Sequence, residues 1–260
     1  MITSPFSFTA IQAAAFILIL MRVAGLFLTS PIFSSPTIPT LLKGSWTLLT
    51  AFLLFTVVPI PEALPLTGAE FGLAVVRELM VGFALGFLAY LMFIGIQLAG
   101  QIADIQMGLG MVNIIDPFTS TQVSVMGQYF YLVATLVFVV VDGHHLLLRA
   151  LADSFSMIPL GHASFTSQTA MFLNQKFEAV FMIAFRVGAP VIGALFLTNL
   201  ALGVLARTVP QMNVFIVGMP LNVAVGFLVV AISMGFYTYV LQGMFQGLYH
   251  DMATLLQTMR

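Results

Sequence analysis

Long runs of apolar residues divide the chain and are separated by short stretches rich in proline, glycine and polar residues. The runs cover residues 10–29, 45–60, 72–103, 123–148, 177–204 and 212–241. About 20 apolar helical residues span the hydrocarbon core of a bilayer. A chain in lipid must satisfy its own backbone hydrogen bonds, and no alternating pattern indicates a β-barrel, so each run is expected to be a helix. The predicted fold class is therefore an all-α membrane protein with about six long hydrophobic helices.

The last two runs are joined by the short segment Arg207-Thr-Val-Pro-Gln-Met-Asn213. So short a connection predicts a tight reversal, and residues 177–241 are expected to form a long helical hairpin. A final run of nearly 30 residues would be about 45 Å long, which exceeds a hydrocarbon core of about 30 Å. We expect Gly218 and Pro220 to kink it. The tail, residues 242–260, reads as a weakly amphipathic helix.

The composition supports a membrane protein and narrows its chemistry. Of the 260 residues, 60% are hydrophobic and 7% are charged, whereas a soluble domain has about 25% charged residues. A net charge of −1 and the lack of a Lys/Arg cluster exclude a nucleic-acid partner. The absence of cysteine excludes disulfides and thiolate metal sites. Residues 1–9 carry no positive charge, so no cleavable leader is expected.

The stretch from Met107 to Pro117 interrupts the apolar runs without becoming polar. Glycine opens left-handed backbone conformations and proline ends regular structure. Irregular backbone at membrane depth is tolerated only where protein buries it or where it lines a passage. We therefore predict a loop that plugs a passage, with Met107 and Met111 as a deformable seal. Its residues are Met107, Gly108, Leu109, Gly110, Met111, Val112, Asn113, Ile114, Ile115, Asp116 and Pro117.

Arg22, Glu78 and Arg186 are charged residues within apolar runs that we expect to lie inside the membrane. A lone arginine in a span costs about 2.5–3.5 kcal/mol on insertion scales, so Arg186 is expected to find a partner. The candidate partners are Glu78, Asp104 and Asp142. Gln97, Gln101 and Asp104 share one helix face. That face either lines a wet passage or caps the helix at a headgroup boundary.

The sequence does not predict an enzyme. It has no phosphate-binding loop, no Gly-x-Ser-x-Gly motif and no His-Glu-x-x-His motif. His144 and His145 are adjacent, so on a helix they point about 100° apart and make a poor metal pair. Asp104 and Asp116 flank one loop, whereas an intramembrane aspartyl protease brings two carboxylates together from different helices. No cofactor or metal site is predicted.

Several stretches together resemble one protein family. The stretches are Arg22 followed by Ser30-Pro-Ile-Phe33, then Gln106-Met-Gly-Leu-Gly110 with Asp116-Pro117, then Asp142-Gly-His144, and residues 199–221. The last is the most specific and reads Asn199-Leu-Ala-Leu-Gly-Val-Leu-Ala-Arg-Thr-Val-Pro-Gln-Met-Asn-Val-Phe-Ile-Val-Gly-Met-Pro-Leu221. Over essentially its whole length the chain is similar to the FliR family, components of the flagellar type III export gate. A virulence-type sibling has the same architecture.

The resemblance implies an assembly. One copy of a FliR-like chain joins several copies each of FliP and FliQ in a helical cone that exports unfolded polypeptides across the bacterial inner membrane at the flagellar basal body. It implies a FliP-like part at 1–176 with a plug loop at 106–120, a FliQ-like hairpin at 177–241 and a tail helix at 242–260. The hairpin tip, with Arg207, Pro210, Gln211 and Asn213, would lie near the cytoplasmic entrance and the partner FlhB. Loop charge leans weakly the other way, because an orientation with both termini inside puts Arg207 outside.

An alternative function is a small-solute or ion-coupled secondary transporter. Helices broken at Pro190 or Pro220, together with Asp104 and Arg186, would form its midplane site. The sequence shows no convincing internal repeat, which counts against this alternative.

Overall fold

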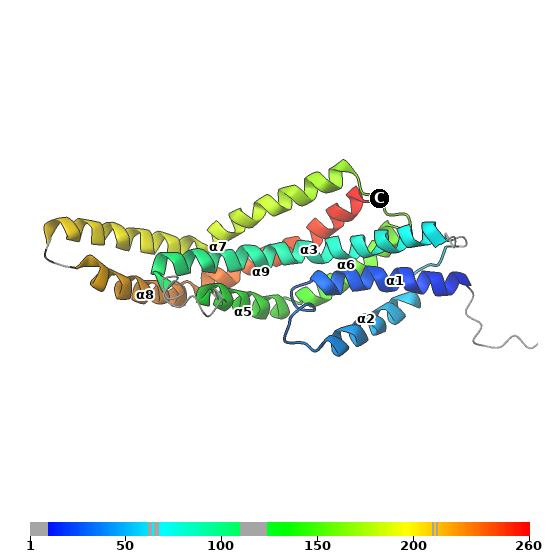
Figure 1. The fold of residues 1–260 in the computed structure, drawn as a ribbon, viewed down its shortest axis with the longest axis horizontal. Helices are drawn as coiled ribbons and strands as arrows, with labels where there is room; N and C mark the ends of the chain where they lie inside the picture. The colour runs from blue at the N-terminus through cyan, green and yellow to red at the C-terminus, as the bar shows by residue number, and fades with distance from the viewer. Residues whose placement is uncertain (1–9, 62–63, 65–67, 110–123, 210, 212) are drawn as a thin grey trace, which may run out of the picture. The chain divides into compact units, whose positions relative to one another are not determined.

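Helices form all the regular secondary structure that the computed structural model describes, which covers residues 10–61, 64, 68–109, 124–209, 211 and 213–260 (Figure 1). The helices are α1 (Ala10–Thr29), α2 (Thr40–Phe55), α3 (Gly68–Met107), α5 (Val125–Val140), α6 (Gly143–Met157), α7 (Ser167–Thr208), α8 (Val214–Ile232) and α9 (Met234–Thr258). The predicted all-α fold class is confirmed, but the described residues hold eight helices rather than about six.

The extra helices arise where two apolar runs are interrupted. Residues 123–148 divide at Asp142, whose φ of 56° is left-handed and ends the helix, and α6 begins at Gly143. The run expected at 212–241 divides at Ser233, where α8 and α9 meet with a bend of 59°. The kink expected at Gly218 and Pro220 stays a prediction: α8 runs continuously through both residues, and the run itself breaks at Ser233. A nearby pair of serine and glycine, here Ser233 and Gly235, is a common cause of a sharp bend.

Three of the described helices, α1, α3 and α7, are long and apolar enough to cross a membrane, and each broken pair, α5 with α6 and α8 with α9, adds one further candidate span. The apolar runs underestimated α3, which has 40 residues, and α7, which has 42. Hydropathy marks where a helix is apolar, whereas both helices continue through polar residues that are compatible with a helix. The tail predicted as a separate helix is the second part of α9.

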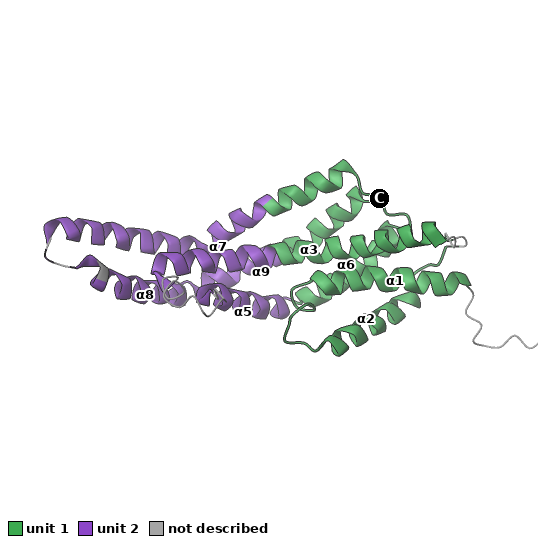
Figure 2. Ribbon diagram, in the orientation of Figure 1, with its two compact units in different colours: residues 1–91, 142–177, 246–260 green, residues 92–141, 178–245 purple. Residues whose placement is uncertain are grey.

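The chain divides into two compact units (Figure 2). Unit 1 comprises residues 1–91, 142–177 and 246–260, and unit 2 comprises residues 92–141 and 178–245. Three helices, α3, α7 and α9, contribute residues to both units.

Glycines bring α1 and α3 into close contact in unit 1. A Cβ atom added to Gly82 would overlap the carbonyl oxygen of Arg22, and one added to Gly25 would overlap that of Leu79. A Cβ on Gly86 would overlap the Thr29 hydroxyl. Gly82 and Gly86, four residues apart on one face of α3, therefore let α1 approach closely.

The last residues of α9 close unit 1. Ser164 donates hydrogen bonds from its amide to Met259 O at 2.9 Å and from its hydroxyl to Arg260 O at 3.0 Å. Thr169 Oγ1 donates to Thr258 O at 2.9 Å. Ser164, before α7, and Thr169, in the first turn of α7, thus bond to carbonyl groups of residues 258–260, which satisfies acceptors that a helix end leaves open.

An aromatic cluster fills unit 2. Phe93 of α3 stacks on Phe245 of α9, with ring centroids 5.7 Å apart, and meets Phe138 of α5 edge to face at 5.6 Å. The ring centroids of Phe130 and Tyr237 lie 4.9 Å apart. Offset and edge-to-face pairs of this kind add about 0.5–1.5 kcal/mol beyond area burial, so the cluster fixes α3, α5 and α9 together within this unit.

Candidate functional site

The described part of the predicted plug is its start. Met107, Gly108 and Leu109 are described, and the predicted plug residues from Gly110 to Pro117 lie outside the described part of the chain. Met107 ends α3, and its side chain is fully buried and touches Gly226 of α8 so closely that a Cβ there would overlap it. Gly108 follows with φ of 81°, a left-handed conformation that stops the helix at no steric cost to glycine.

One carboxylate connects the two helices that flank this segment. Asp104, near the end of α3, accepts a hydrogen bond from Ser124 Oγ at 2.5 Å and another from the amide of Met126 at 3.2 Å. Ser124 is the N-cap of α5, and its Oγ also accepts from the amide of Gly127 at 2.8 Å. An anion is favoured at a helix N-terminus. Asp104, Ser124 and Met126, called here the loop anchor, hold the chain at both ends of residues 105–123.

Close backbone contact reinforces the loop anchor. A Cβ atom on Gly100 of α3 would overlap the backbone of Gly127 in α5. The sequence left open whether Gln97, Gln101 and Asp104 line a wet passage or cap the helix at a headgroup boundary, and that choice stays a prediction. Asp104 has a contact that neither alternative included, because its side chain is 6% exposed and bonded to the start of α5.

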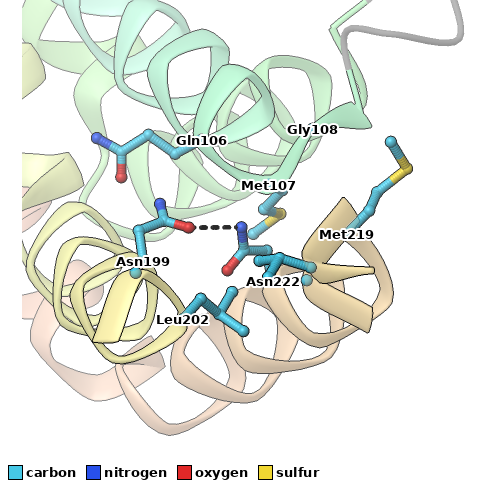
Figure 3. Close-up of a pocket in the computed structure, with 10 residues that line it drawn as sticks. Gln106, Met107, Gly108, Asn199, Leu202, Met219 and Asn222 are labelled. Carbon is cyan, nitrogen blue, oxygen red and sulfur yellow. Dashed lines mark hydrogen bonds between the residues drawn. The ribbon is translucent and has the colours of Figure 1, made fainter. Parts of the chain in front are cut away.

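A pocket lies beside the start of the plug (Figure 3). Its volume is about 360 Å³. It is lined by Gln106, Met107, Gly108, Asn199, Leu202, Gly203, Val214, Gly218, Met219 and Asn222. The Asn222 side chain donates from Nδ2 to Asn199 Oδ1 at 2.9 Å, so an amide pair links α8 to α7 at the wall of the pocket. Hydrogen bonds between polar side chains join helices where apolar packing is not selective.

The predicted helical hairpin is present in unit 2. Helix α7 ends at Thr208 and α8 begins at Val214, and the amide pair holds the two helices together. Of the predicted tip residues, Arg207, Gln211 and Asn213 are exposed, and Pro210 lies outside the described residues. The described tip residues are thus polar and solvent-exposed.

The charged residues predicted inside apolar runs behave differently from one another. Arg22 and Glu78 are fully buried and form a salt bridge, with Nε donating to Oε2 at 2.5 Å. The sequence did not indicate this pairing, because the two residues are 56 positions apart in separate runs. The guanidinium also lies over the ring of Phe155, 4.2 Å from its centroid.

Hydrogen bonds complete this buried cluster in unit 1. Arg22 donates from Nη1 to Ser154 Oγ and from Nη2 to Ile158 O, both at 3.1 Å. The second carboxylate oxygen of Glu78 accepts the amide of Gly161 at 2.8 Å. A buried charge is tolerated when it is paired and hydrogen-bonded. The cluster therefore ties α1, α3, α6 and the turn after α6 to one another.

The carboxylate partner expected for Arg186 stays a prediction. Its side chain is exposed on α7, and within the described ranges it forms no salt bridge. Two of the proposed partners form other bonds. Glu78 pairs with Arg22, and Asp104 belongs to the loop anchor. Because α7 leaves this position uncovered by the chain itself, the guanidinium faces outward.

Asp142, His144 and His145 lie closer together than their positions on a helix predict. One ligand atom from each lies within 4.8 Å of the others. Asp142 and His145 are about three-quarters exposed, and the group sits at the first turn of α6, where the helix dipole opposes a cation. The cluster is a solvated turn by these criteria, and we assign no metal to it.

The same helical segments match known proteins in sequence. The family model described as bacterial export proteins, family 1, matches residues 13–248. The chain belongs to this family. Flagellar biosynthetic protein FliR of Bacillus subtilis strain 168 is 37% identical over 245 residues, which cover 93% of this chain and 94% of that protein.

More distant relatives carry the same description. The protein of Escherichia coli K12 named FliR is 28% identical over 91% of this chain and 90% of its own length. The FliR of Aquifex aeolicus strain VF5 is 29% identical over 92% of each chain. The resemblance to the FliR family is thereby confirmed over almost the whole chain, and membership of an export-protein family agrees with the prediction that the chain is not an enzyme.

Sequence reasoning missed three contributors to these sites. Ser124, directly before an apolar helix, is a readable N-cap signal. Asn199 and Asn222 fall in the stretch that carried the resemblance, but their contact required the hairpin register.

Proposed function

We propose that this chain is a structural subunit of the flagellar type III protein export gate, which forms the channel with FliP and FliQ and supplies an apolar plug loop that seals the closed pore. The proposal places one copy of the chain among several copies of each partner, in the bacterial inner membrane at the flagellar basal body. In this proposal the exported cargo is unfolded polypeptides. The family and its relatives, named for flagellar biosynthesis, support it.

The loop anchor is the observation that supports the proposed plug. A seal needs residues that close on one another and a base that does not move when they part. Hydrogen bonds to a charged group contribute about 1.5–3 kcal/mol each, and Asp104 accepts such bonds from both Ser124 and Met126. Between the two ends of this base the sequence places Met111, Val112, Ile114 and Ile115. Apolar side chains of this kind exclude hydrated ions.

Exposed apolar surface on the hairpin supports assembly with other helices. Large side chains along α7 and α8 are more than half exposed in the isolated chain; they include Phe181, Phe185, Phe196, Leu197, Ile216 and Leu228. Lipid or neighbouring helices must cover such a surface. We propose that FliQ-like packing covers the hairpin 177–241, that residues 1–176 take the place of a FliP-like subunit, and that 242–260 closes the unit.

The hairpin tip provides the contact with FlhB in this proposal. Arg207, Gln211 and Asn213 are exposed and polar, and with Pro210 they form the end of the hairpin. The proposal puts them at the cytoplasmic entrance, against the weak lean of loop charge.

The first test is the mass of the assembly. The chain is co-expressed with the membrane proteins encoded beside it and purified through a tag after Arg260. One large hetero-oligomer with a single copy of this chain supports the proposal. A monomer or homodimer free of those neighbours contradicts it.

The second test concerns the plug. Deleting residues 109–115 leaves the loop anchor in place, so the assembly should form and the membrane should leak ions. A membrane that stays tight to ions while the assembly is intact shows that the loop is not the seal.

The transporter alternative gains no support from the described residues. Its midplane site required Asp104 and Arg186 together, but Asp104 is bonded to the start of α5 and Arg186 is exposed on α7. Flux of a small solute by the purified chain alone would restore it.

A further inference from the structure

An apolar pocket opens between α1 and α2 in unit 1. Its volume is about 330 Å³. It is lined by Ala13, Phe16, Ile17, Phe52 and Phe55. Phe16 and Phe55 meet edge to face with their ring centroids 5.7 Å apart, so the pocket has a fixed aromatic wall contributed by both helices.

The lining determines what this pocket holds. A cavity lined only by hydrocarbon offers water no hydrogen-bond partner, and a dry apolar cavity of about 150 Å³ binds benzene. At about 330 Å³ this pocket accepts a longer hydrocarbon. A helix of about 10–12 Å diameter is too wide to enter it, whereas a single extended hydrocarbon chain is not.

The surroundings connect the pocket to the membrane. Helix α2 buries only Ala51 of its 16 residues. Large apolar side chains continue outward from the pocket, with Leu49 56% and Leu53 58% exposed. A hydrocarbon chain can therefore pass from the apolar exterior of α2 into the pocket without crossing a polar rim.

The expected depth of the pocket in the membrane fits the acyl chain of a lipid rather than its headgroup. Trp46, the only tryptophan of the chain, lies near the start of α2 close to Lys43, and both residue types anchor helices at the membrane interface. At a rise of about 1.5 Å per residue, Phe52 is about 9 Å and Phe55 about 14 Å along the helix from Trp46. Half of a hydrocarbon core is about 15 Å thick, so the pocket lies at the depth of acyl chains.

We propose that this pocket binds one acyl chain of a membrane phospholipid, with the lipid headgroup at the level of Trp46. The bound chain fills the space between α1 and α2 that no side chain of the described residues occupies. It joins two helices that meet mainly through apolar contacts, and the site is independent of the export function.

Photolabelling tests the proposal directly. The co-purified complex is reconstituted in vesicles of phosphatidylethanolamine and phosphatidylglycerol that contain a small fraction of phosphatidylcholine with a diazirine in mid-chain. After irradiation, labelled peptides are mapped by mass spectrometry. We expect labelling at Phe16, Ile17 and Phe52 to exceed by several-fold the labelling at Leu132 and Leu136 of α5. Those two are matched controls, because they are 53% and 68% exposed and Phe52 is 57% exposed.

A pocket-filling variant gives an independent readout. Ala13→Phe places a ring in the pocket and should remove the excess labelling at Phe52 without changing the labelling of α5. Leu28→Phe adds a ring at an exposed position of the same helix outside the pocket and should leave the excess intact. If Ala13→Phe fails to fold, the wild-type ratio decides alone.

Three results would overturn the proposal. They are equal labelling of pocket and control positions, an excess that persists in Ala13→Phe, and an absence of label at the pocket residues. The last result would show that lipid does not enter the pocket in the complex.

Discussion

Arg22 Nε lies 2.5 Å from Glu78 Oε2, and both side chains are fully buried. Each partner has further hydrogen bonds, to Ser154, Ile158 and Gly161. No polar solvent compensates either charge, so the two residues depend on one another. This dependence makes the pair the most sensitive point of unit 1.

Removing one partner of this pair should be severe. Breaking a buried ion pair leaves an uncompensated charge and costs about 3–5 kcal/mol, so Glu78→Ala or Arg22→Ala should strongly lower the thermal stability and the membrane level of the chain. The matched control is Arg149→Ala, because Arg149 and Asp153 form an exposed pair at 3.9 Å and such pairs contribute about 0–1 kcal/mol. Equal losses for Glu78→Ala and Arg149→Ala would show that the buried pair is not special.

The glycine contact between α1 and α3 should tolerate no methyl group. Gly82→Ala brings a Cβ onto the carbonyl of Arg22, and overpacking of this kind costs about 1–3 kcal/mol. Gly72 lies in the same helix with no atom within 4 Å of an added Cβ, so Gly72→Ala should be neutral or stabilise by up to about 1 kcal/mol. Melting curves of the two purified variants make the comparison, and a tolerated Gly82→Ala would mean that α1 moves freely on α3.

Weakening the loop anchor should affect the seal before the fold. Ser124→Ala removes both the bond to Asp104 and the N-cap of α5, and loss of a serine N-cap costs about 0.5–2 kcal/mol. We expect the complex to assemble but to conduct ions more readily, as measured by dye-reported flux in vesicles. Ser156→Ala is the control, since that hydroxyl bonds only within its own helix. Unchanged flux in Ser124→Ala would separate the anchor from the seal.

The amide pair of the hairpin should show coupling in a double-mutant cycle. Asn199→Leu or Asn222→Leu leaves one amide without its partner, whereas the double variant replaces both by apolar groups. Interhelical hydrogen bonds in membranes contribute about 0.6–2 kcal/mol, so the double variant should be more stable than the sum of the single changes predicts. Strict additivity in the measured unfolding free energies would exclude the pair as a link between α7 and α8.

The apolar runs predicted the existence of helices more accurately than they predicted the residues at which the helices end. Run length alone places α1 correctly, because both of its ends are marked by a change in hydropathy. The break at Asp142 depends on one residue in a left-handed conformation, which no average over a window of residues detects. The last run breaks at Ser233, whereas α8 continues through Pro220, and hydropathy marks neither position.

The site residues also divide into those that the sequence indicates and those that it does not. Residues that act through local backbone, such as Gly108 as a helix stop, are readable from the sequence. Pairings between distant segments are not, and Arg22 with Glu78 is the clearest case. The partner expected for Arg186 stays a prediction, because the chain itself leaves this position uncovered.

The composition of unit 1 has a consequence for biogenesis. The unit joins residues 1–91 and 142–177 to residues 246–260, and Ser164 and Thr169 bond to carbonyl groups of residues 258–260. While the ribosome still holds the last of these segments, that part of the molecule lacks one of its components. The helical body built from the earlier segments therefore stays incomplete until residues 246–260 have been synthesised, and a product truncated before them would leave this body open to quality-control proteases.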